Sequence, residues 1–342
     1  MSERPGIVPV IAPSGWHVWG NERAVADLQR AAAHGPRHAY ILTGPDAVGK
    51  RTIALEFARA LVCERPPAPG IPCGQCSRCR RVARGVHPDV TAVDLATQAA
   101  AEKASSASRN TSLNVGTVRE ISANVALRPV EANWRVVIVD DVETMQETAQ
   151  EAFLKTLEEP PAYTVILLLT SDVDLLLPTI LSRCVTIPMQ VVPTRTIREA
   201  LITAGVEPDK AEIIADLSDG RIGWTFAAAN DPTLVEKQEA LHTDARRWVH
   251  ASDYDRLIRA TTMADRFSKD REVVFGELLA VQLEWRRALI DSVQATPDGS
   301  KASPRGLVTA VRSVERCIVD LEANVRPRLA MQSMVLQWPP LS

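Results

Sequence analysis

Aromatic residues are scarce in this chain of 342 residues: only 4% are Phe, Trp or Tyr, although 46% are hydrophobic. We therefore expect a mainly aliphatic core. No run of eighteen apolar residues occurs, which argues against a membrane-spanning helix. The first thirteen residues are proline-rich and contain no continuous apolar segment, which argues against a signal peptide. The sequence thus predicts a soluble, cytoplasmic protein with no membrane partner.

Charge of one sign is also scarce, because the formal net charge is −3 and no long block of like charges occurs. Independent tight binding to DNA is therefore not expected. The length exceeds that of one ordinary domain and suggests two or three.

Four of the six cysteines lie within seventeen residues: Cys63, Cys73, Cys76 and Cys79. Four thiolates at this spacing can reach one tetrahedral ion and leave no open position, so the pattern favours a structural zinc site. The alternative is a loop of reduced, unligated cysteines. A redox motif is less consistent, since the local pattern is not thioredoxin-like.

Short apolar runs alternate with helical patterns in the first half of the chain, which predicts a parallel α/β sheet. The runs are Ala39–Thr43, Val90–Val93, Val136–Val139, Val165–Leu169 and the strand-like Val185–Ile187. The Ala/Ser-rich residues 96–112 are expected to form a surface excursion. After Pro188 we expect only helices. The predicted domains are an α/β domain at 1–188, a small helical lid at 189–234 and a helical collar at 235–342.

The segment from Gly44 to Lys50 matches the phosphate-loop pattern G-x-x-x-x-G-K between an expected strand and an expected helix. Its amides and Lys50 would face a nucleotide phosphate, and Gly44 and Gly49 would allow the turn. The next residue should be Ser or Thr, which binds Mg²⁺, but it is Arg51. Thr52 follows one place later, rotated by about 100° around the helix, so it does not replace the missing hydroxyl. ATP or ADP binding stays open, whereas hydrolysis is in doubt.

Asp140 and Asp141 directly follow the strand Val136–Val139 and resemble a Walker B pair. AAA+ ATPases usually carry Glu at the second position, which polarises the attacking water. Asp141 is one methylene shorter, and a small misplacement costs heavily in rate. The alternative is an ordinary exposed acid pair at the end of a strand.

Three motifs together resemble the gamma/tau and delta-prime subunits of the bacterial DNA polymerase III clamp loader, which are AAA+ proteins. The first is the phosphate-loop helix that runs into the cysteine cluster. The second is the stretch AFLKTLEEPP at 152–161, and the third is Ser182-Arg183-Cys184. The resemblance covers essentially the whole chain and is strongest over residues 16–190.

Departures from the gamma/tau pattern favour a delta-prime-like member. Arg51 and Asp141 stand at the positions discussed above, and Gly223 stands where gamma/tau carry a sensor-2 arginine. The stretches GRIGW at 220–224 and ANVRPRLA at 323–330 are similar to delta-prime sequences, and the length also fits.

The resemblance implies an AAA+ α/β domain with a zinc insertion, a lid and a collar that joins five subunits in a ring. Gamma/tau and delta subunits would be its partners. The ring opens the β sliding clamp and places it on primed DNA. Arg183 would supply an arginine finger to the neighbouring ATPase site.

Two other functions remain open at this point. One is a hydrolysis-competent, gamma/tau-like ATPase subunit. The other is a zinc module that binds nucleic acid through Arg78, Arg80, Arg81 and Arg84. The acidic balance of the chain and the lack of interleaved aromatic residues favour a solvated face for these arginines.

Overall fold

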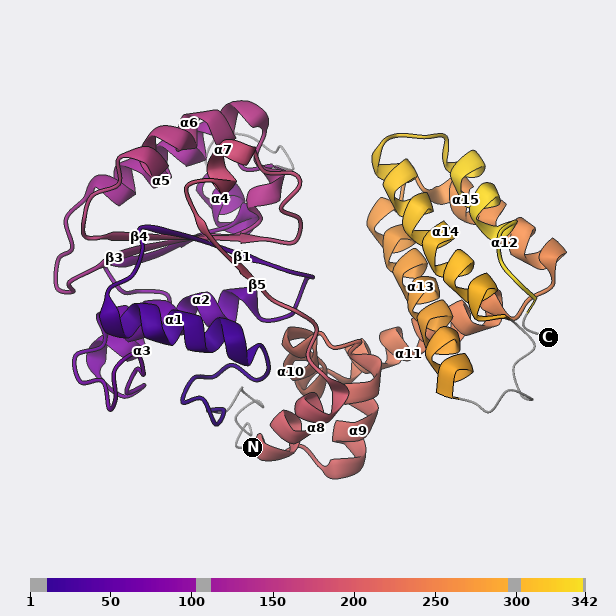
Figure 1. Ribbon diagram of the computed structural model, residues 1–342, viewed down its shortest axis with the longest axis horizontal. Helices are drawn as coiled ribbons and strands as arrows, with labels where there is room; N and C mark the ends of the chain where they lie inside the picture. The colour runs from indigo at the N-terminus through magenta and orange to yellow at the C-terminus, as the bar shows by residue number, and fades with distance from the viewer. Residues whose placement is uncertain (1–10, 103–111, 295–302, 341–342) are drawn as a thin grey trace. The chain divides into compact units, whose positions relative to one another are not determined.

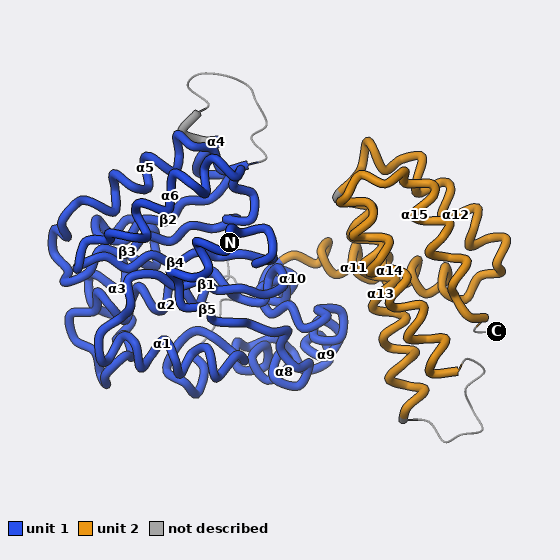
Figure 2. The backbone as a smooth tube through the Cα atoms, turned by 45° about the horizontal axis from the view of Figure 1, so that its top comes forward, with its two compact units in different colours: residues 1–230 blue, residues 231–342 orange. Residues whose placement is uncertain are grey.

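The computed structural model describes residues 11–102, 112–294 and 303–340. The chain forms two compact units, residues 1–230 and 231–342 (Figure 2). Each has its own hydrophobic core. The finer division into three domains stays a prediction.

A five-stranded, all-parallel sheet in the order β2-β3-β4-β1-β5 forms the centre of the first unit. Its strands are β1 (Ala39–Thr43), β2 (Val90–Val93), β3 (Arg135–Val139), β4 (Thr164–Thr170) and β5 (Val185–Pro188). Strands β3 and β4 are buried along their whole length, as continuous apolar runs require when helices cover both faces of a sheet.

Helices cover both faces of this sheet (Figure 1). On one face lie α1 (Glu22–His34), α2 (Lys50–Val62) and α3 (Ser77–Ala83). On the other lie α5 (Val115–Ala126), α6 (Glu147–Glu158) and α7 (Pro178–Leu181). Successive side chains of a strand point to opposite faces, so Leu167 joins the core under α1 and α2 whereas Leu168 joins the core under α5 and α6. This is the expected α/β core of the AAA+ type.

The expected surface excursion at 96–112 is wrong in part, because it overlaps helix α4 (Leu95–Glu102). Gln98 on this helix is buried and its amide oxygen accepts hydrogen bonds from the Asn114 backbone and the Thr117 hydroxyl. Polar packing of this kind leaves no apolar periodicity in the sequence. Residues 103–111 lie outside the described part of the chain. A short 3-10 turn, η1 (Val142–Thr144), follows β3.

Three short helices complete the first unit: α8 (Thr194–Thr203), α9 (Pro208–Leu217) and α10 (Ile222–Asn230). They pack on one another. Within the described residues no strand follows Pro188, as expected.

The second unit is all-helical. It comprises α11 (Pro232–Val249), α12 (Asp253–Arg266), α13 (Arg271–Gln294), α14 (Pro304–Glu322) and α15 (Pro327–Val335). The buried indoles of Trp248 and Trp285 both pack edge-on against Trp338 in its core. None of the helices in the described ranges combines the length and apolar character needed to cross a membrane.

Candidate functional site

The phosphate-loop pattern lies where the sequence predicts it, between β1 and α2. Gly44 and Gly49 have φ values of 152° and 100°, in the region that favours glycine. Gly44 also has no room for a side chain, because a Cβ there would lie 2.2 Å from the Met189 carbonyl oxygen. Both positions therefore require glycine for the observed backbone, and the chain after β5 packs directly against the loop.

Lys50, the expected phosphate ligand, is buried and bonded within its own loop. Its Nζ donates to the carbonyl oxygens of Gly44, at 2.6 Å, and Pro45, at 3.1 Å. The carboxylate of Asp46 lies 3.5 Å away. Phosphate oxygens would have to compete with these acceptors for the ammonium group. The lysine is therefore satisfied without a nucleotide.

Arg51 joins two carboxylates at the ends of neighbouring strands. One guanidinium nitrogen, Nη1, donates to Asp94 at 2.8 Å and to Asp140 at 3.3 Å. Asp94 directly follows β2 and Asp140 directly follows β3. A cation thus holds the carboxylate of the Walker B position, where Mg²⁺ would be expected. Asp94 is a residue that the sequence analysis missed, although a polar residue at the end of a parallel strand is a signal for this edge.

The two carboxylates respond differently to their surroundings. Burial opposes ionisation of Asp94, but hydrogen bonds from the Thr97 amide and from Arg51 hold its pKa below the usual value. At Asp140 burial prevails and raises the pKa, although the Asp141 amide and Arg51 oppose the rise. Burial and the neighbouring charge of Asp140 also raise the pKa of Asp141. Without Arg51 this edge would hold closely spaced, poorly solvated acids.

Asp141 and Thr52 directly follow Asp140 and Arg51 in the chain. Asp141 has a left-handed backbone (φ 55°) and precedes η1, where its carbonyl oxygen accepts a hydrogen bond from the Thr144 hydroxyl. Thr52 lies one residue beyond Arg51 on α2, and successive helical residues diverge by about 100°.

Helix α10 touches the phosphate loop at Gly223. The Gly223 amide donates to the Ala47 carbonyl oxygen at 2.7 Å. A Cβ at position 223 would lie 2.9 Å from that oxygen, closer than real Cβ atoms approach. Position 223 therefore contributes a backbone donor to the loop, and any side chain there would require the loop or the helix to shift.

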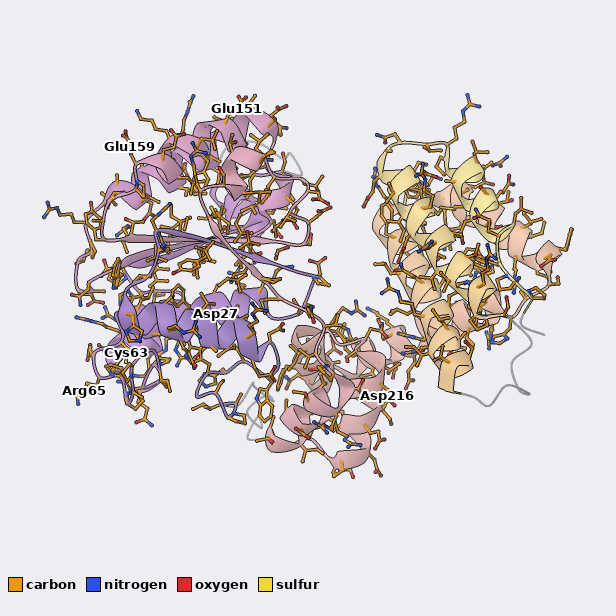
Figure 3. All side chains as sticks on the ribbon, viewed as in Figure 1. Asp27, Cys63, Arg65, Glu151, Glu159 and Asp216 are labelled. Carbon is orange, nitrogen blue, oxygen red and sulfur yellow. The ribbon has the colours of Figure 1, made fainter. Side chains whose placement is uncertain are left out.

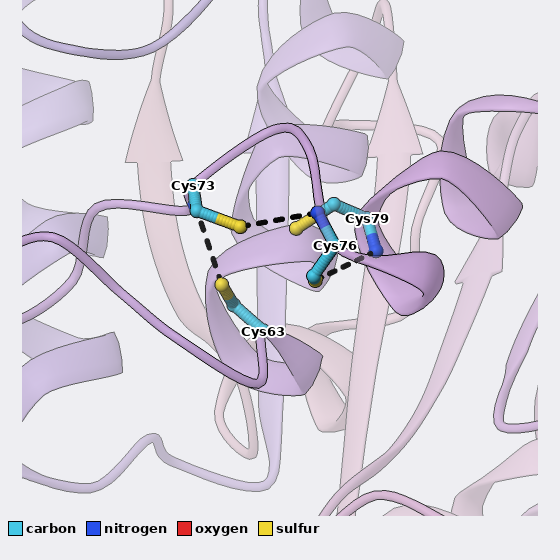
Figure 4. A group of neighbouring side chains, drawn as sticks. All are labelled: Cys63, Cys73, Cys76 and Cys79. Carbon is cyan, nitrogen blue, oxygen red and sulfur yellow. Dashed lines mark hydrogen bonds between the residues drawn. The ribbon is translucent and has the colours of Figure 1, made fainter.

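The four clustered cysteines converge on one point (Figure 4). Cys63 ends α2, Cys76 caps α3, Cys79 lies within α3 and Cys73 lies in the connecting loop. Their sulfur atoms all lie within 4.8 Å of one another. The amides of Cys73, Cys76 and Cys79 donate to the sulfurs of Cys63, Cys73 and Cys76 at 3.3, 3.3 and 3.4 Å.

These residues fit a zinc ion. Tetrahedral Zn–S bonds of about 2.3 Å place neighbouring sulfurs about 3.8 Å apart, so only small side-chain movements are needed. Amide donors to sulfur favour the thiolate form that zinc requires. Cys184 and Cys317 lie elsewhere, and burial raises the pKa of each thiol to about 12.

A second group of possible metal ligands, His87, Asp89 and Glu131, connects two segments of the chain through hydrogen bonds and an ion pair. The Asp89 carboxylate accepts the amides of Val130, Glu131 and Ala132 at 2.6, 2.9 and 2.9 Å. The Glu131 carboxylate lies 3.1 Å from His87 Nε2. These carboxylates fasten the segment before β3 to the segment before β2.

Arg183 lies between α7 and the edge strand β5, as expected. Its side chain is one-third exposed, and Nη2 donates to the Glu158 carboxylate at 2.7 Å. Nη1 donates to the Thr179 carbonyl oxygen at 2.8 Å. Glu158 belongs to the EEPP motif, so the second and third motifs of the resemblance meet here.

The arginines of the zinc insertion do not form one free cationic surface. Arg78 lies 3.6 Å from the Glu64 carboxylate, and Arg81 lies 2.5 Å from that of Glu131. Arg80 and Arg84 are exposed. Half of this cluster is thus neutralised within the unit, which weakens the case for a nucleic-acid interface.

Comparison with known proteins gives consistent matches. Residues 20–193, just over half of the chain, match the family described as "DNA polymerase III, delta subunit". DNA polymerase III subunit delta' of Pseudomonas aeruginosa is 39% identical over 148 residues, which cover 43% of this chain and 42% of the relative. Subunit tau of Salmonella typhimurium is 25% identical over 342 residues, covering 94% and 51%. Subunit gamma of Buchnera aphidicola from Acyrthosiphon pisum is 30% identical over 284 residues, covering 75% and 69%.

The matches to the delta' and tau proteins span about half or less of those relatives' lengths, and both kinds of subunit are represented. The family match does not depend on whether the chain is a delta' or a gamma/tau subunit. It covers the phosphate loop, the cysteine cluster and Arg183. The chain therefore belongs to the family of DNA polymerase III clamp-loader subunits that includes delta', gamma and tau.

Proposed function

We propose that this chain is a delta-prime-like subunit of the clamp loader, with little ATP hydrolysis of its own. The observation that carries this proposal is the bridge from Arg51 to Asp94 and Asp140. A Mg²⁺ ion at the same edge would have to displace a guanidinium group, and no hydroxyl replaces the missing Ser or Thr. The residues present do not fit a magnesium–nucleotide complex.

Two further contacts support the same reading. Lys50 is engaged by loop carbonyl oxygens, and Gly223 binds Ala47 through its backbone. Contacts within the chain thus link the loop to the lid helix, a connection that nucleotide would supply in an active subunit. Weak ATP or ADP binding through the loop amides is compatible with this arrangement, but rapid turnover is not.

In this proposal Arg183 acts in the neighbouring subunit. A guanidinium fork is always charged and can contact γ-phosphate oxygens as charge spreads during transfer. The bond to Glu158 holds the side chain in one direction while no neighbour is present. When a gamma/tau subunit docks, the Arg183 guanidinium would leave this partly exposed carboxylate and contact a phosphate. The free-energy cost would be small because exposed ion pairs contribute little.

The proposed complex contains gamma/tau and delta subunits and acts on the β sliding clamp and primed DNA. Within it, the cysteine cluster would hold one structural zinc ion. The zinc module then stiffens the end of α2, the helix that begins at the phosphate loop.

The test is reconstitution of the loader with wild-type chain or Arg183→Ala, followed by measurement of clamp- and DNA-stimulated ATPase. An arginine supplied in trans is worth on the order of 10³–10⁵ in rate at one site. We expect a partial loss of total ATPase, because other sites receive other fingers. Arg195→Ala, at an exposed arginine on α8, is the control. Equal rates for Arg183→Ala and wild type, with assembly confirmed, would reject the finger role.

A hydrolysis-competent gamma/tau-like subunit is the second candidate, since the tau relative aligns with 94% of this chain. Steady-state ATPase of the purified chain separates the two candidates. Magnesium-dependent turnover that Lys50→Ala abolishes would establish the motor.

A further inference from the structure

A groove runs along the edge of the sheet between α1 and β5. Its volume is about 630 Å³, within the range of ligand-binding clefts. Arg23, Arg30, His34 and Arg37 line it from α1 and the turn that follows, and Val185 and Thr186 line it from β5. All six side chains are exposed. Nothing in the nucleotide loop or the zinc module contributes to this groove.

Positive charge predominates on the helix side of the groove. Asp27 is the only acid among the described residues that line it, and it already pairs with Arg30 at 3.2 Å (Figure 3 labels Asp27 on α1). Neither Arg23 nor Arg37 has an ion-pair partner within the described part of the chain. His34 adds a further charge when protonated. The groove is therefore cationic although the whole chain carries a net charge of −3.

The strand side of the groove offers backbone hydrogen-bonding groups. Within the part of the chain that the structure describes, β5 is an edge strand that pairs only with β1. The Met189 amide donates to Thr43 of β1, and alternate residues of a strand face the same neighbour, so Ile187 faces β1 and Thr186 faces outward. The backbone of Pro188 also faces outward, but proline has no N–H to donate. One complete N–H and C=O pair, that of Thr186, is thus available at the open edge.

These features suit a peptide better than a nucleic acid. Single-stranded nucleic acids bind through aromatic platforms. Among the described lining residues Tyr40 is the only aromatic, and it is buried, with its hydroxyl accepting a hydrogen bond from the Arg37 amide at 2.8 Å. An extended peptide can instead use the Thr186 backbone, place apolar side chains on Val185 and direct acidic ones to the arginines. Eleven helical steps from Arg23 to His34 span about 17 Å, the length of about five extended residues.

We propose that this groove binds a short, extended, acidic peptide segment of a partner protein, which adds beside β5 and pairs its carboxylates with Arg23 and Arg37. Pro188 ends the open edge and so restricts the added strand to a short segment. The same proline disfavours pairing between copies of this chain through the edge. This site is independent of the nucleotide loop and of the finger role of Arg183.

The test uses the full chain and a short fluorescein-labelled peptide of alternating glutamate and valine, followed by fluorescence anisotropy. We expect saturable binding that weakens as salt rises. Reversing two exposed charges, Arg23→Glu with Arg37→Glu, should weaken binding by about tenfold or more, since each contact changes from attraction to repulsion. The matched control, Arg80→Glu with Arg84→Glu, makes the same change in net charge at exposed positions away from the groove and should leave binding unchanged.

A backbone variant tests the strand-addition geometry separately. Thr186→Pro removes the outward N–H, and proline is tolerated on an open edge, so the variant should keep the melting temperature yet lose about fivefold or more in affinity. Thr186→Val keeps the N–H and should bind like wild type. Absence of binding by the wild-type chain, or equal losses in the groove and control variants, would overturn the proposal. Tighter binding of an oligothymidine through the same arginines would also overturn it, in favour of nucleic acid.

Discussion

Replacing Arg51 by methionine tests whether this arginine stands in for a metal ion. The substitution keeps much of the aliphatic stem but removes the charge that joins Asp94 and Asp140. The two carboxylates are 17% and 20% exposed, whereas the arginine is 45% exposed. Solvent therefore screens part of each interaction, and we take about 0.5–1 kcal/mol for each ion pair. The expected loss is about 1–2 kcal/mol of unfolding free energy, or roughly 2–8 °C in the melting temperature of a unit of this size.

The pH dependence of this loss has a defined sign. The folded-state pKa of Asp94 is lowered, so its ionised form contributes stability above the unfolded-state pKa, and that contribution disappears as the pH falls through the folded value. Burial raises the pKa of Asp140, and loss of Arg51 raises it further. As the pH falls, Asp140 of the variant is therefore protonated before that of wild type, which removes the repulsion between the two carboxylates. The difference in melting temperature between wild type and Arg51→Met should thus be largest at neutral pH. It should narrow as the pH falls to about 4 and vanish only below the lowered folded-state pKa of Asp94.

Magnesium provides the decisive comparison. With the guanidinium gone, two carboxylates face one another across a small gap and can bind a divalent cation through oxygen. Mg²⁺ should raise the melting temperature of Arg51→Met and leave that of wild type nearly unchanged, as followed by differential scanning fluorimetry. Arg23→Met, at an exposed arginine outside this site, is the control. If Arg51→Met melts like wild type, or if Mg²⁺ stabilises both chains equally, the substitution of metal by arginine is refuted.

Three further predictions concern the site. The purified chain should contain about one zinc ion, and Cys76→Ser should lose it while Cys184→Ser keeps it, as measured by elemental analysis. Lys50→Ala should leave the ATPase of the assembled loader nearly unchanged, because Lys50 is already bonded to its own loop; a large loss would make this site a working motor. Gly223→Ala should loosen α10, because the new methyl group would press on the Ala47 carbonyl oxygen, and hydrogen exchange of this helix should rise. Gly276→Ala, where no atom lies within 4 Å, should not raise exchange in α10, and the same rise in both variants would contradict this reading.

The strands were predictable because burial on both faces leaves a local signature. Continuous apolar runs predict β3 and β4 to within one residue at each end. The expectation of helices alone after Pro188, the last residue of β5, likewise holds for the described residues. Helix α4 was missed since its buried anchor is the polar Gln98, whose bonds to Asn114 and Thr117 lie sixteen and nineteen residues away. Hydrophobic periodicity contains no information about such a helix.

For the site, the sequence by itself determined the chemistry that is available. Spacing predicted the phosphate loop and the cysteine cluster, because each motif lies within one turn or one insertion of the chain, whereas the resemblance to the clamp-loader family singled out Arg183. Spacing also predicted that Arg51 stands where the phosphate-loop pattern places the Ser or Thr that binds Mg²⁺. These inferences need only local geometry, which bond lengths and helix pitch fix.

Only the tertiary structure decided what these groups contact. Arg51 meets Asp94 and Asp140 across 43 and 89 residues of sequence, and Arg183 meets Glu158 across 25. The Gly223 amide reaches Ala47 from a different helix. Parallel strands bring their carboxyl ends to one edge whatever their separation along the chain, so these partners follow from strand order and helix packing. Sequence spacing does not encode that order, and for this reason the partners of Arg51, Arg183 and Gly223 became visible only in the folded chain.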